Sequence, residues 1–423
     1  MLKQHESADI NHTLEKLFRL QRLGIKVGLE HTYELLNRCG NPHNNLRTIH
    51  LAGTNGKGST AAMVQSILRN AGLKVGLYTS PHLVSFNERI RVNGTQVSNN
   101  FIIDFMKKFN DDIDEIKSTF FETTTAMALT HFANKKVDFA VIEVGLGGRL
   151  DSTNVVVPKV TAITPISLDH REILGGDLLS IANEKGGIIK KNTPLILGLQ
   201  DESVNAHLHK IAKQKNAPVV DIEEIKEISL SSEGTRFKIK SGNYLTPLLG
   251  HHQAHNTVKA ITVVKSIIPK INFSTIQEGL KKTIWNGRLQ KISNNLPLYY
   301  DVAHNSAGIS VTIQTIKSVY GKMPHIVLCL KGNKEIELIS SALKNKYEKL
   351  IITGSSKMKL MEAKELAQAL AKNGLNYNIE IKNDYNDAFN FLIDSISLTN
   401  QPGIIMGSHY IAKAVFDKFG IFT

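Results

Sequence analysis

Cysteine, tryptophan and long apolar runs are all scarce in this chain of 423 residues. Its two cysteines, Cys39 and Cys329, lie far apart in the sequence, so a disulfide framework is not expected and a reducing cytoplasm is the expected setting. No apolar run approaches the roughly 20 residues that a membrane-spanning helix needs. The first residues lack the apolar core of a signal peptide. These absences predict a cytoplasmic protein with no membrane partner.

Acidic residues are fewer than basic ones, which leaves a formal net charge of +13. The lysines are scattered and form pairs rather than runs, and no zinc-finger spacing or RNA-recognition signature is present. We therefore expect no nucleic-acid partner. A basic surface suits small polyanionic substrates, because it raises their local concentration.

The length of the chain predicts two domains. Strand-like and helix-like segments alternate from residue 46 to about residue 199, and a second alternating series begins at residue 296. Such alternation predicts an α/β fold with mostly parallel sheets covered by helices. We expect strands at residues 75–79, 137–144, 160–164 and 194–199, then at 325–330, 349–353, 377–381 and 403–406, with a hairpin at 237–244 between the series. The expected domains are residues 1–292 and a smaller, Rossmann-like α/β domain at residues 296–423.

A glycine-rich loop, GTNGKGST at residues 53–60, stands between an apolar run and a helical pattern. Glycines allow backbone N–H groups to surround phosphate oxygens, a helix N-terminus adds a positive dipole, and a lysine reaches the terminal phosphates. The spacing differs from the usual Walker loop, because Leu51 stands where its first glycine would fall. A tight turn with a surface lysine is the structural alternative. The motif predicts a phosphate cradle made by Gly53, Thr54, Asn55, Gly56, Lys57, Gly58 and Ser59.

Four further polar residues belong to the expected carboxyl edge of the sheet, where ligands gather in such folds. Ser80 follows the strand at 75–79, Glu143 ends the strand at 137–144, His170 follows the strand at 160–164, and Lys185 lies late in a helix. One carboxylate, a hydroxyl and a histidine are sufficient protein ligands for Mg²⁺, which keeps several waters. Taken singly, each residue has a structural alternative: a turn serine, a loop-capping glutamate, a hydrogen-bonded histidine and a solvated lysine.

An ordered set of motifs resembles folylpolyglutamate synthase and dihydrofolate synthase, which belong to the Mur ligase superfamily. The motifs are GTNGKGS, TSPHLVSFNERI, FETTTA, EVGLGGRLDSTN, LDH, IANEKGGI, HHQAHN, WNGRL and DVAHN. The resemblance spans most of the chain and implies a P-loop ATP-binding domain of the Mur ligase type followed by a glutamate-binding domain. It also implies an ATP-dependent ligase that adds L-glutamate to a folate or to dihydropteroate through an acyl phosphate, and that acts as a monomer.

The resemblance assigns roles to matching positions. It implies that Lys57 is the main cation on the phosphates, that Ser80 and Glu143 bind one Mg²⁺, that His170 binds a second, and that Lys185 carries a carbamate formed with CO₂. It places nucleotide contacts at Asn256, Arg288, Asp301 and His304. It places the pterin side of the acceptor at Pro81, His82, Phe86, Arg89, Phe121 and Glu122. The spacing of His251 and His255 offers a metal-binding pair as an alternative use of the HHQAHN motif.

Several departures from the family pattern lie in the C-terminal half. Residues 332–335 are GNKE where many relatives have an Asp-Lys-Asp motif, and residues 356–359 are SKMK where a Pro-Arg-Ala motif is common. These changes affect substrate preference more than phosphate chemistry, so the choice between dihydrofolate synthesis, polyglutamate extension or both stays open. Two other functions also stay open: another amino-acid ligase of the same superfamily, and a basic nucleotide-binding protein without ligase activity.

Overall fold

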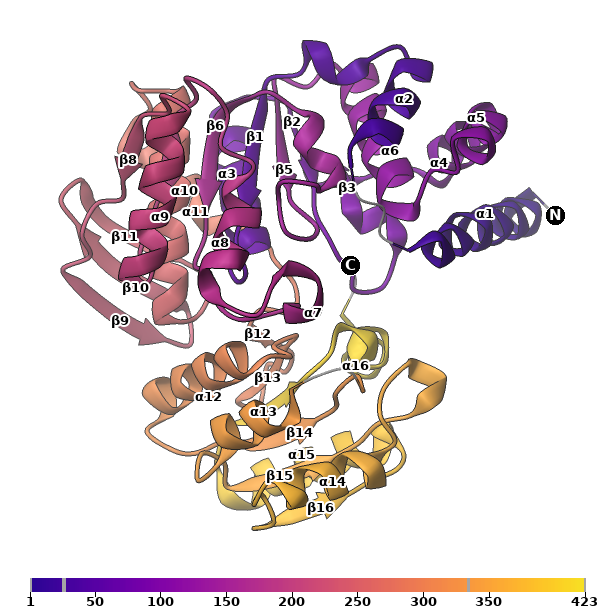
Figure 1. The fold of residues 1–423 in the computed structure, drawn as a ribbon. Helices are drawn as coiled ribbons and strands as arrows, with labels where there is room; N and C mark the ends of the chain where they lie inside the picture. The colour runs from indigo at the N-terminus through magenta and orange to yellow at the C-terminus, as the bar shows by residue number, and fades with distance from the viewer. Residues whose placement is uncertain (1, 25–27, 333–334, 422–423) are drawn as a thin grey trace. The chain divides into compact units, whose positions relative to one another are not determined.

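Residues 2–24, 28–332 and 335–421 are described by the computed structural model, those before residue 9 as backbone only. Asn333 and Lys334, which belong to the first departure named above, lie outside this set. The chain divides into two compact units, residues 1–223 with 255–282 and residues 224–254 with 283–423. Figure 1 shows the elements of each unit. The expected division between residues 292 and 296 stays a proposal about functional domains.

The first unit is built on one large sheet in the strand order β4-β3-β2-β5-β1-β6-β7-β8. Strands β2, β5, β1, β6, β7 and β8 run parallel, and β3 and β4 are antiparallel additions at one edge. This arrangement confirms the predicted α/β class with a mostly parallel sheet. The strands are β1 Thr48–Ala52, β2 Val75–Tyr78, β3 Ile90–Val92, β4 Thr95–Gln96, β5 Phe139–Glu143, β6 Pro158–Ile163, β7 Leu195–Leu197 and β8 Val219–Asp221.

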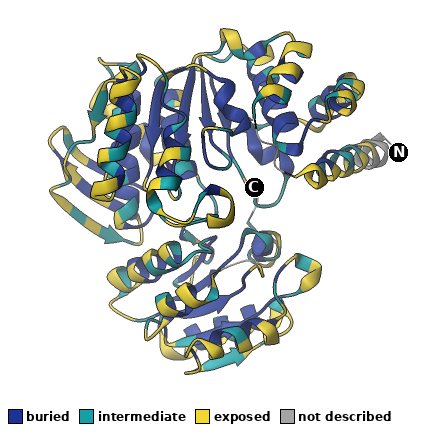
Figure 2. Ribbon diagram, in the orientation of Figure 1, coloured by how far each residue is buried: buried dark blue, intermediate teal, exposed yellow. Residues whose placement is uncertain are grey.

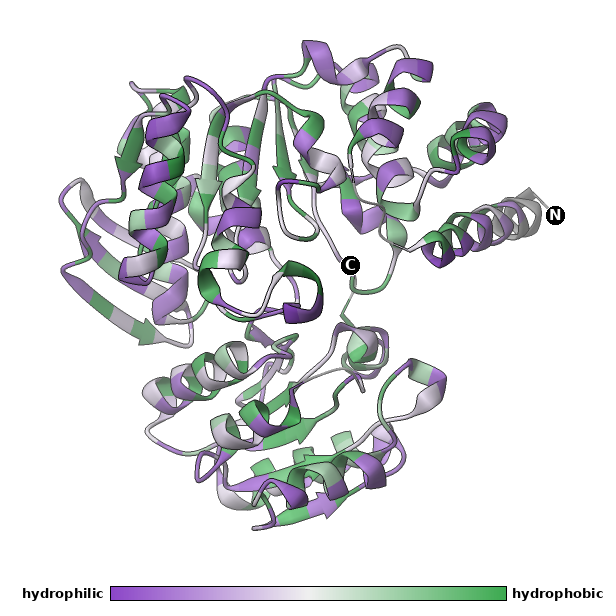
Figure 3. Cartoon of the chain, in the orientation of Figure 1, coloured by the Kyte–Doolittle hydropathy of each residue, from purple (hydrophilic) through white to green (hydrophobic). Residues whose placement is uncertain are grey.

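Helices cover this sheet because its central strands are buried and mostly apolar, with Thr48, His50 and Glu143 as polar members of β1 and β5. All five residues of β1 and of β5 are buried, and Figure 2 shows these strands in the colour of buried residues. Figure 3 shows the same strands as mostly hydrophobic. The helices are α1 Leu2–Arg19, α2 Glu30–Arg38, α3 Lys57–Asn70, α4 Asn99–Lys108, α5 Asn110–Ile116, α6 Phe120–Lys135, α7 Arg171–Leu174, α8 Leu178–Gly186, α9 Glu202–Gln214, α10 His251–Ile267 and α11 Phe273–Lys281.

The second unit has a six-stranded sheet in the order β12-β13-β17-β14-β15-β16, in which only β12 is antiparallel. A separate antiparallel sheet, β11-β10-β9, contains the predicted hairpin. The strands are β9 Glu227–Ser231, β10 Gly234–Ile239, β11 Gly242–Thr246, β12 Gln290–Lys291, β13 Leu298–Asp301, β14 His325–Leu328, β15 Lys349–Ile352, β16 Ile379–Ile381 and β17 Gly403–Met406. The helices are α12 Ser306–Tyr320, α13 Ile336–Leu343, α14 Ala363–Lys372, α15 Tyr385–Thr399 and α16 Ala412–Phe419.

The small antiparallel sheet groups with the C-terminal part of the chain, although it precedes α10 in sequence. Leu230 of β9 packs against the core that also contains Ile309, Ile313 and Leu328. This long-range packing has no signature in the local sequence of the hairpin. Among the described residues, none of the helices combines the length and apolar character that crossing a bilayer requires.

Candidate active site

Four segments meet at the carboxyl edge of the large sheet. Strands β2, β5, β1 and β6 are consecutive neighbours and run parallel, so the residues that follow them emerge at the same edge. These residues are Ser80 after β2, Glu143 at the end of β5, the glycine-rich loop after β1, and Asp169 with His170 after β6.

The glycine-rich loop depends on glycine at two positions. Gly53 has a φ of +139°, and a Cβ there would run into Thr164. Gly56, with a φ of +88°, is the N-cap of α3, and a Cβ there would clash with the side-chain amide of Asn256. Both positions therefore require glycine for conformation and for space. The second close approach also places Asn256, predicted as a nucleotide contact, directly against the loop.

Lys57 begins α3 and lies over the loop that precedes it. Its ammonium donates to the carbonyl oxygens of Gly53 at 3.0 Å and Thr54 at 3.1 Å. The first N–H groups of a helix have no acceptor within the helix, and the helix dipole places positive charge there. The buried Gly58 and Ser59 belong to this first turn. Backbone donors, dipole and ammonium are the groups that an anion-binding loop uses, and the phosphate cradle stays a prediction.

A second segment, which includes Pro165 and Ser167, forms hydrogen bonds to the loop that were not predicted from the sequence. The backbone N–H groups of Thr54 and Asn55 donate to the carbonyl oxygen of Pro165, at 3.0 and 3.4 Å. The Thr54 hydroxyl donates to the carbonyl oxygen of Ser167 at 3.0 Å and accepts from its N–H. These bonds tie the phosphate loop to the turn that leads to Asp169 and His170.

The structure brings Ser80 and Glu143 into contact. The Ser80 backbone N–H donates to Glu143 Oε2 at 3.1 Å, and the glutamate is buried at the end of its strand. A carboxylate and a hydroxyl-bearing residue thus lie side by side at the ends of the neighbouring strands β5 and β2.

His170 lies at the same edge in a left-handed backbone conformation with a φ of +51°. Its ring is half-exposed, and its nitrogens lie 3.9 Å from the Asp169 carboxylate and 3.8 Å from that of Glu172. Asp169 belongs to the LDH motif, but no role was predicted for it.

Lys185 is a buried lysine whose pKa is lowered. It lies on α8 with only 5% of its surface exposed, and burial, followed by repulsion from Lys57, lowers its pKa to about 7. Asp169 and Asp151 act in the opposite direction, because their negative charge favours the ammonium. Lys185 is therefore not the solvated helix lysine of the structural alternative. It is a buried amine that interacts electrostatically with Lys57.

Asp151 organises the glycine-rich segment that follows Glu143, and the sequence analysis missed this role. Its carboxylate accepts from the N–H groups of Gly145, Leu146 and Thr153, at 3.0, 2.8 and 3.0 Å. Burial raises the pKa of this carboxyl, and these hydrogen bonds oppose the rise. Gly148 of the same segment packs so closely on the backbone of Lys185 that a Cβ would approach its Cα to 3.0 Å.

The residues predicted for the pterin side form an aromatic cluster around Arg89. Arg89 Nε donates to His82 Nδ1 at 2.8 Å, and its guanidinium lies 5.8 Å from the ring centroid of Phe121. The rings of His82 and Phe86 are 6.3 Å apart, centroid to centroid. Phe86 and Arg89 are buried, whereas Pro81 is exposed.

Glu122 has a local structural role in addition to any role in binding. Its carboxylate accepts from the Thr119 N–H at 2.7 Å and completes a capping box at the start of α6. The same carboxylate lies 3.9 Å from the ring of His31. A capping-box glutamate is recognisable in sequence by its position three residues after a threonine.

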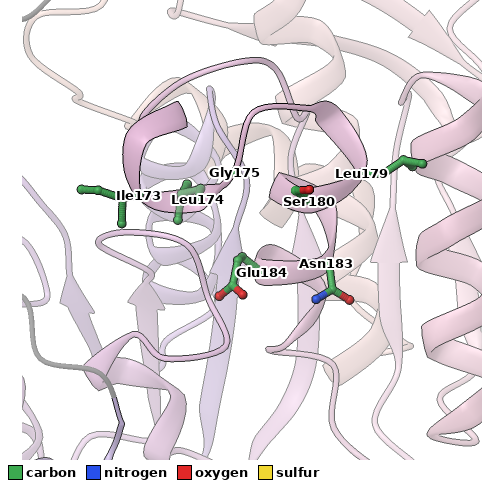
Figure 4. A pocket seen from close by; sticks show the side chains of 7 residues that line it. All are labelled: Ile173, Leu174, Gly175, Leu179, Ser180, Asn183 and Glu184. Carbon is green, nitrogen blue, oxygen red and sulfur yellow. The ribbon is translucent and has the colours of Figure 1, made fainter.

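An open depression of about 590 Å³ lies between α7 and α8. Leu174 contributes from α7, and Asn183 and Glu184 contribute from α8, immediately before Lys185 (Figure 4). Glu184 also accepts from Arg149 at 2.9 Å.

The remaining predicted residues lie in the second unit, around the end of β13. Asp301 is buried, and its carboxylate accepts from the N–H groups of Leu289 at 2.8 Å and Ala303 at 2.7 Å. Burial raises the pKa of this carboxyl, whereas the charge of Arg288 lowers it. His304 Nδ1 lies 2.9 Å from the Val302 carbonyl oxygen. Asp301 thus links the segment bearing Arg288 to the segment bearing His304.

Comparisons with known proteins agree with this architecture. The Mur ligase middle domain matches residues 51–264, and the Mur ligase glutamate ligase domain matches residues 287–409. Dihydrofolate synthase/folylpolyglutamate synthase of Bacillus subtilis (strain 168) is 37% identical over 351 residues, covering 78% of this chain and 79% of the relative. Folylpolyglutamate synthase of Lacticaseibacillus casei is 30% identical over 402 residues, covering 90% and 92% respectively.

A solved structure extends the similarity over nearly the whole chain. Folylpolyglutamate synthase of Mycobacterium tuberculosis, complexed with ADP and AMPPCP, matches with a TM-score of 0.90 and 29% identity. The match covers 98% of this chain and 99% of that one. The chain therefore belongs to the folylpolyglutamate synthase and dihydrofolate synthase family of the Mur ligases.

Proposed function

We propose that this chain uses ATP to join L-glutamate to the carboxylate of a folate, with dihydropteroate as a second candidate acceptor. The observation that supports this most is the gathering, at one sheet edge, of a phosphate cradle, the Ser80–Glu143 contact and the buried Lys185. The names of the relatives point to the same chemistry.

The reaction needs ATP because a carboxylate is a poor electrophile. An acceptor carboxylate oxygen attacks the γ-phosphorus, the bond from that phosphorus to the β,γ-bridging oxygen breaks, and ADP leaves. The glutamate amine then attacks the acyl carbon, the bond from that carbon to the phosphate oxygen breaks, and the nitrogen loses a proton. In both steps Lys57 and the backbone donors of the loop stabilise the negative charge that develops on phosphate oxygens.

Magnesium fits the donors at this edge. Among the described residues no group of three or more His, Cys, Asp or Glu side chains could hold a metal alone. Mg²⁺ does not need such a group, because it binds through one or two protein ligands plus phosphate oxygens and waters. Glu143 and Ser80 would hold one ion, and His170 beside Asp169 would support a second. The ions would neutralise phosphate charge as the two anionic reactants approach.

Lys185 would act as a carbamate. Its neutral amine nitrogen would bond to the carbon of CO₂ and lose a proton, which replaces a cation by an anion. The lowered pKa supports this proposal, because only the neutral amine is a nucleophile. Asn256 against the loop would contact the nucleotide base, and Arg288, Asp301 and His304 would act at the ribose and phosphates. The aromatic cluster around Arg89 would receive the pterin side of the acceptor.

The exchange Glu143→Gln should lower kcat by about 10²-fold and raise the Mg²⁺ concentration needed for half-maximal rate, since the amide carries no charge. The Ser80 N–H can still donate to the amide oxygen, so the melting temperature should change little. Glu115→Gln, at a glutamate of α5 with 69% of its side chain exposed, is the matched control and should keep both values. An unchanged Mg²⁺ dependence in Glu143→Gln would remove Glu143 from the metal site.

Coupled ADP release tests the function directly. Release should require Mg-ATP, glutamate and an acceptor together, and it should be measured with dihydropteroate and with tetrahydrofolate. Turnover with both acceptors indicates a bifunctional enzyme, and turnover with one assigns a single branch. If folded protein supplied with bicarbonate releases no ADP with either acceptor, the proposal is contradicted. That result favours another Mur-type amino-acid ligase or a nucleotide-binding protein.

The remaining expectations need separate measurements. We propose that the chain acts as a monomer in the cytoplasm and binds no nucleic acid. Light scattering of the purified protein and titration with a labelled oligonucleotide test the first and last of these.

A further inference from the structure

Strand β6 ends without a continuous neighbour on one of its two sides. On the β1 side its hydrogen bonds continue past the strand, because Thr164 donates to Ala52 and Pro165 accepts from Thr54. On the β7 side, Ile163 is paired in register with Leu197, the last residue of β7. The backbone groups from Ile163 onward therefore need partners from elsewhere.

Two side chains supply these partners. Lys259 Nζ donates to the carbonyl oxygen of Ile163 at 2.9 Å. Gln200 Nε2 donates to the carbonyl oxygen of Thr164 at 3.0 Å, and Gln200 Oε1 accepts from the N–H of Ile166 at 3.0 Å. Together the two side chains make three bonds to three residues of the segment 163–166, much as a neighbouring strand would.

Burial of the Lys259 side chain costs free energy, because its charged form loses its hydration. Only 2% of its surface is exposed, and burial lowers its pKa to about 7. Its amine nitrogen remains a hydrogen-bond donor in both protonation states, so the bond to Ile163 does not depend on the charge. On α10 it follows Asn256 by three residues, one helical turn, and Asn256 packs against Gly56 of the phosphate loop. The same helix thus contacts the loop and the strand end that supports it.

We propose that Gln200 and Lys259 are positioning residues for nucleotide binding and phosphoryl transfer. They fix the end of β6, so that Pro165 and Ser167 keep their hydrogen bonds to the glycine-rich loop. This inference rests on the proposed function. The chain of contacts runs from Gln200 to Thr164 and Ile166, and through the intervening Pro165 to the N–H groups of Thr54 and Asn55. Neither side chain needs to touch substrate for its loss to displace the loop.

The test uses Gln200→Met and Lys259→Met, which keep the side-chain length and remove the polar contacts. Each variant should raise the Kd for AMPPCP by about tenfold, the effect of one lost hydrogen bond of ordinary strength, and should lower kcat more than a loss of stability explains. The amide protons of Thr54 and Asn55 should exchange faster with solvent. Gln200→Glu, which keeps an acceptor for Ile166 but no donor for Thr164, should be intermediate.

Ser66→Ala is the matched control. Ser66 Oγ donates to the Gly279 carbonyl oxygen at 2.6 Å, so this variant loses a buried side-chain-to-backbone bond between α3 and α11. It should lower the melting temperature and leave nucleotide affinity unchanged.

The inference is overturned if Gln200→Met behaves in the same way, with a lower melting temperature but unaltered Kd and amide exchange. Should Lys259→Met fail to fold, Gln200→Met decides alone, since Gln200 is only half-buried. Nucleotide affinity is measured without an acceptor, so the result stands even if ligase activity is not found.

Discussion

Lys57→Ala should lower turnover by about three orders of magnitude while leaving the protein folded. The ammonium is the cation of the phosphate loop, and removing even one preorganised donor from developing charge costs about 10²–10³ in rate. Loss of a full charge should therefore lower kcat by on the order of 10³-fold. Alanine is an excellent helix former at the start of α3, so the free energy of unfolding should change by less than about 1 kcal/mol. Single-turnover ADP formation and thermal unfolding measure the two effects.

The control for this variant is Lys213→Ala on α9. Lys213 is an exposed lysine of the same unit, and its loss should alter neither rate nor stability. Retention of more than a tenth of the wild-type kcat by Lys57→Ala would contradict the phosphate assignment.

Depletion of CO₂ should abolish the activity of the wild-type enzyme, and added bicarbonate should restore that activity. The buried amine of Lys185, with its pKa lowered to about 7, is protonated below that pH and neutral above it. At a fixed concentration of dissolved CO₂, recovery should therefore be several times faster at pH 8 than at pH 6. Lys185→Ala should lose about 10²–10³ in kcat and regain part of it with formate or acetate, whose carboxylate stands in for the carbamate.

A spectroscopic control separates Lys185 from the other buried lysine. Protein supplied with ¹³C-bicarbonate should show a carbamate resonance that Lys185→Ala lacks and Lys259→Met retains, although burial lowers the pKa of both lysines to about 7. Full activity of CO₂-free wild-type protein would exclude the carbamate.

The expected strands were predictable from local sequence to within a few residues. The run expected at residues 403–406 is β17, and the run expected at 349–353 is β15, one residue shorter. Apolar runs between turn residues predict buried parallel strands well, because such strands are buried on both faces. The grouping of β9, β10 and β11 with the C-terminal unit was not predictable, since it depends on contacts such as that of Leu230 with a distant core.

The candidate site likewise contains residues that local sequence identifies and residues whose role depends on the tertiary structure. The glycine-rich loop is recognisable in sequence because it consists of consecutive residues. Ser80 and His170 each follow an expected strand, and Glu143 lies at the end of one. The roles of Gln200 and Lys259 were not predicted, because each acts on backbone groups that folding brings to it from elsewhere in the chain. Side chains of this kind have no local pattern.

By itself, the sequence determined the α/β class, the position of the glycine-rich loop and the family to which this chain belongs, because local hydrogen bonding and apolar periodicity act over short stretches of chain. The tertiary structure alone decided which strands are neighbours, and through that order it brought Ser80 to Glu143 and the β6 turn beneath the phosphate loop. It also decided that Lys185 and Lys259 are buried amines rather than surface cations, because desolvation depends on what the whole fold packs around a side chain.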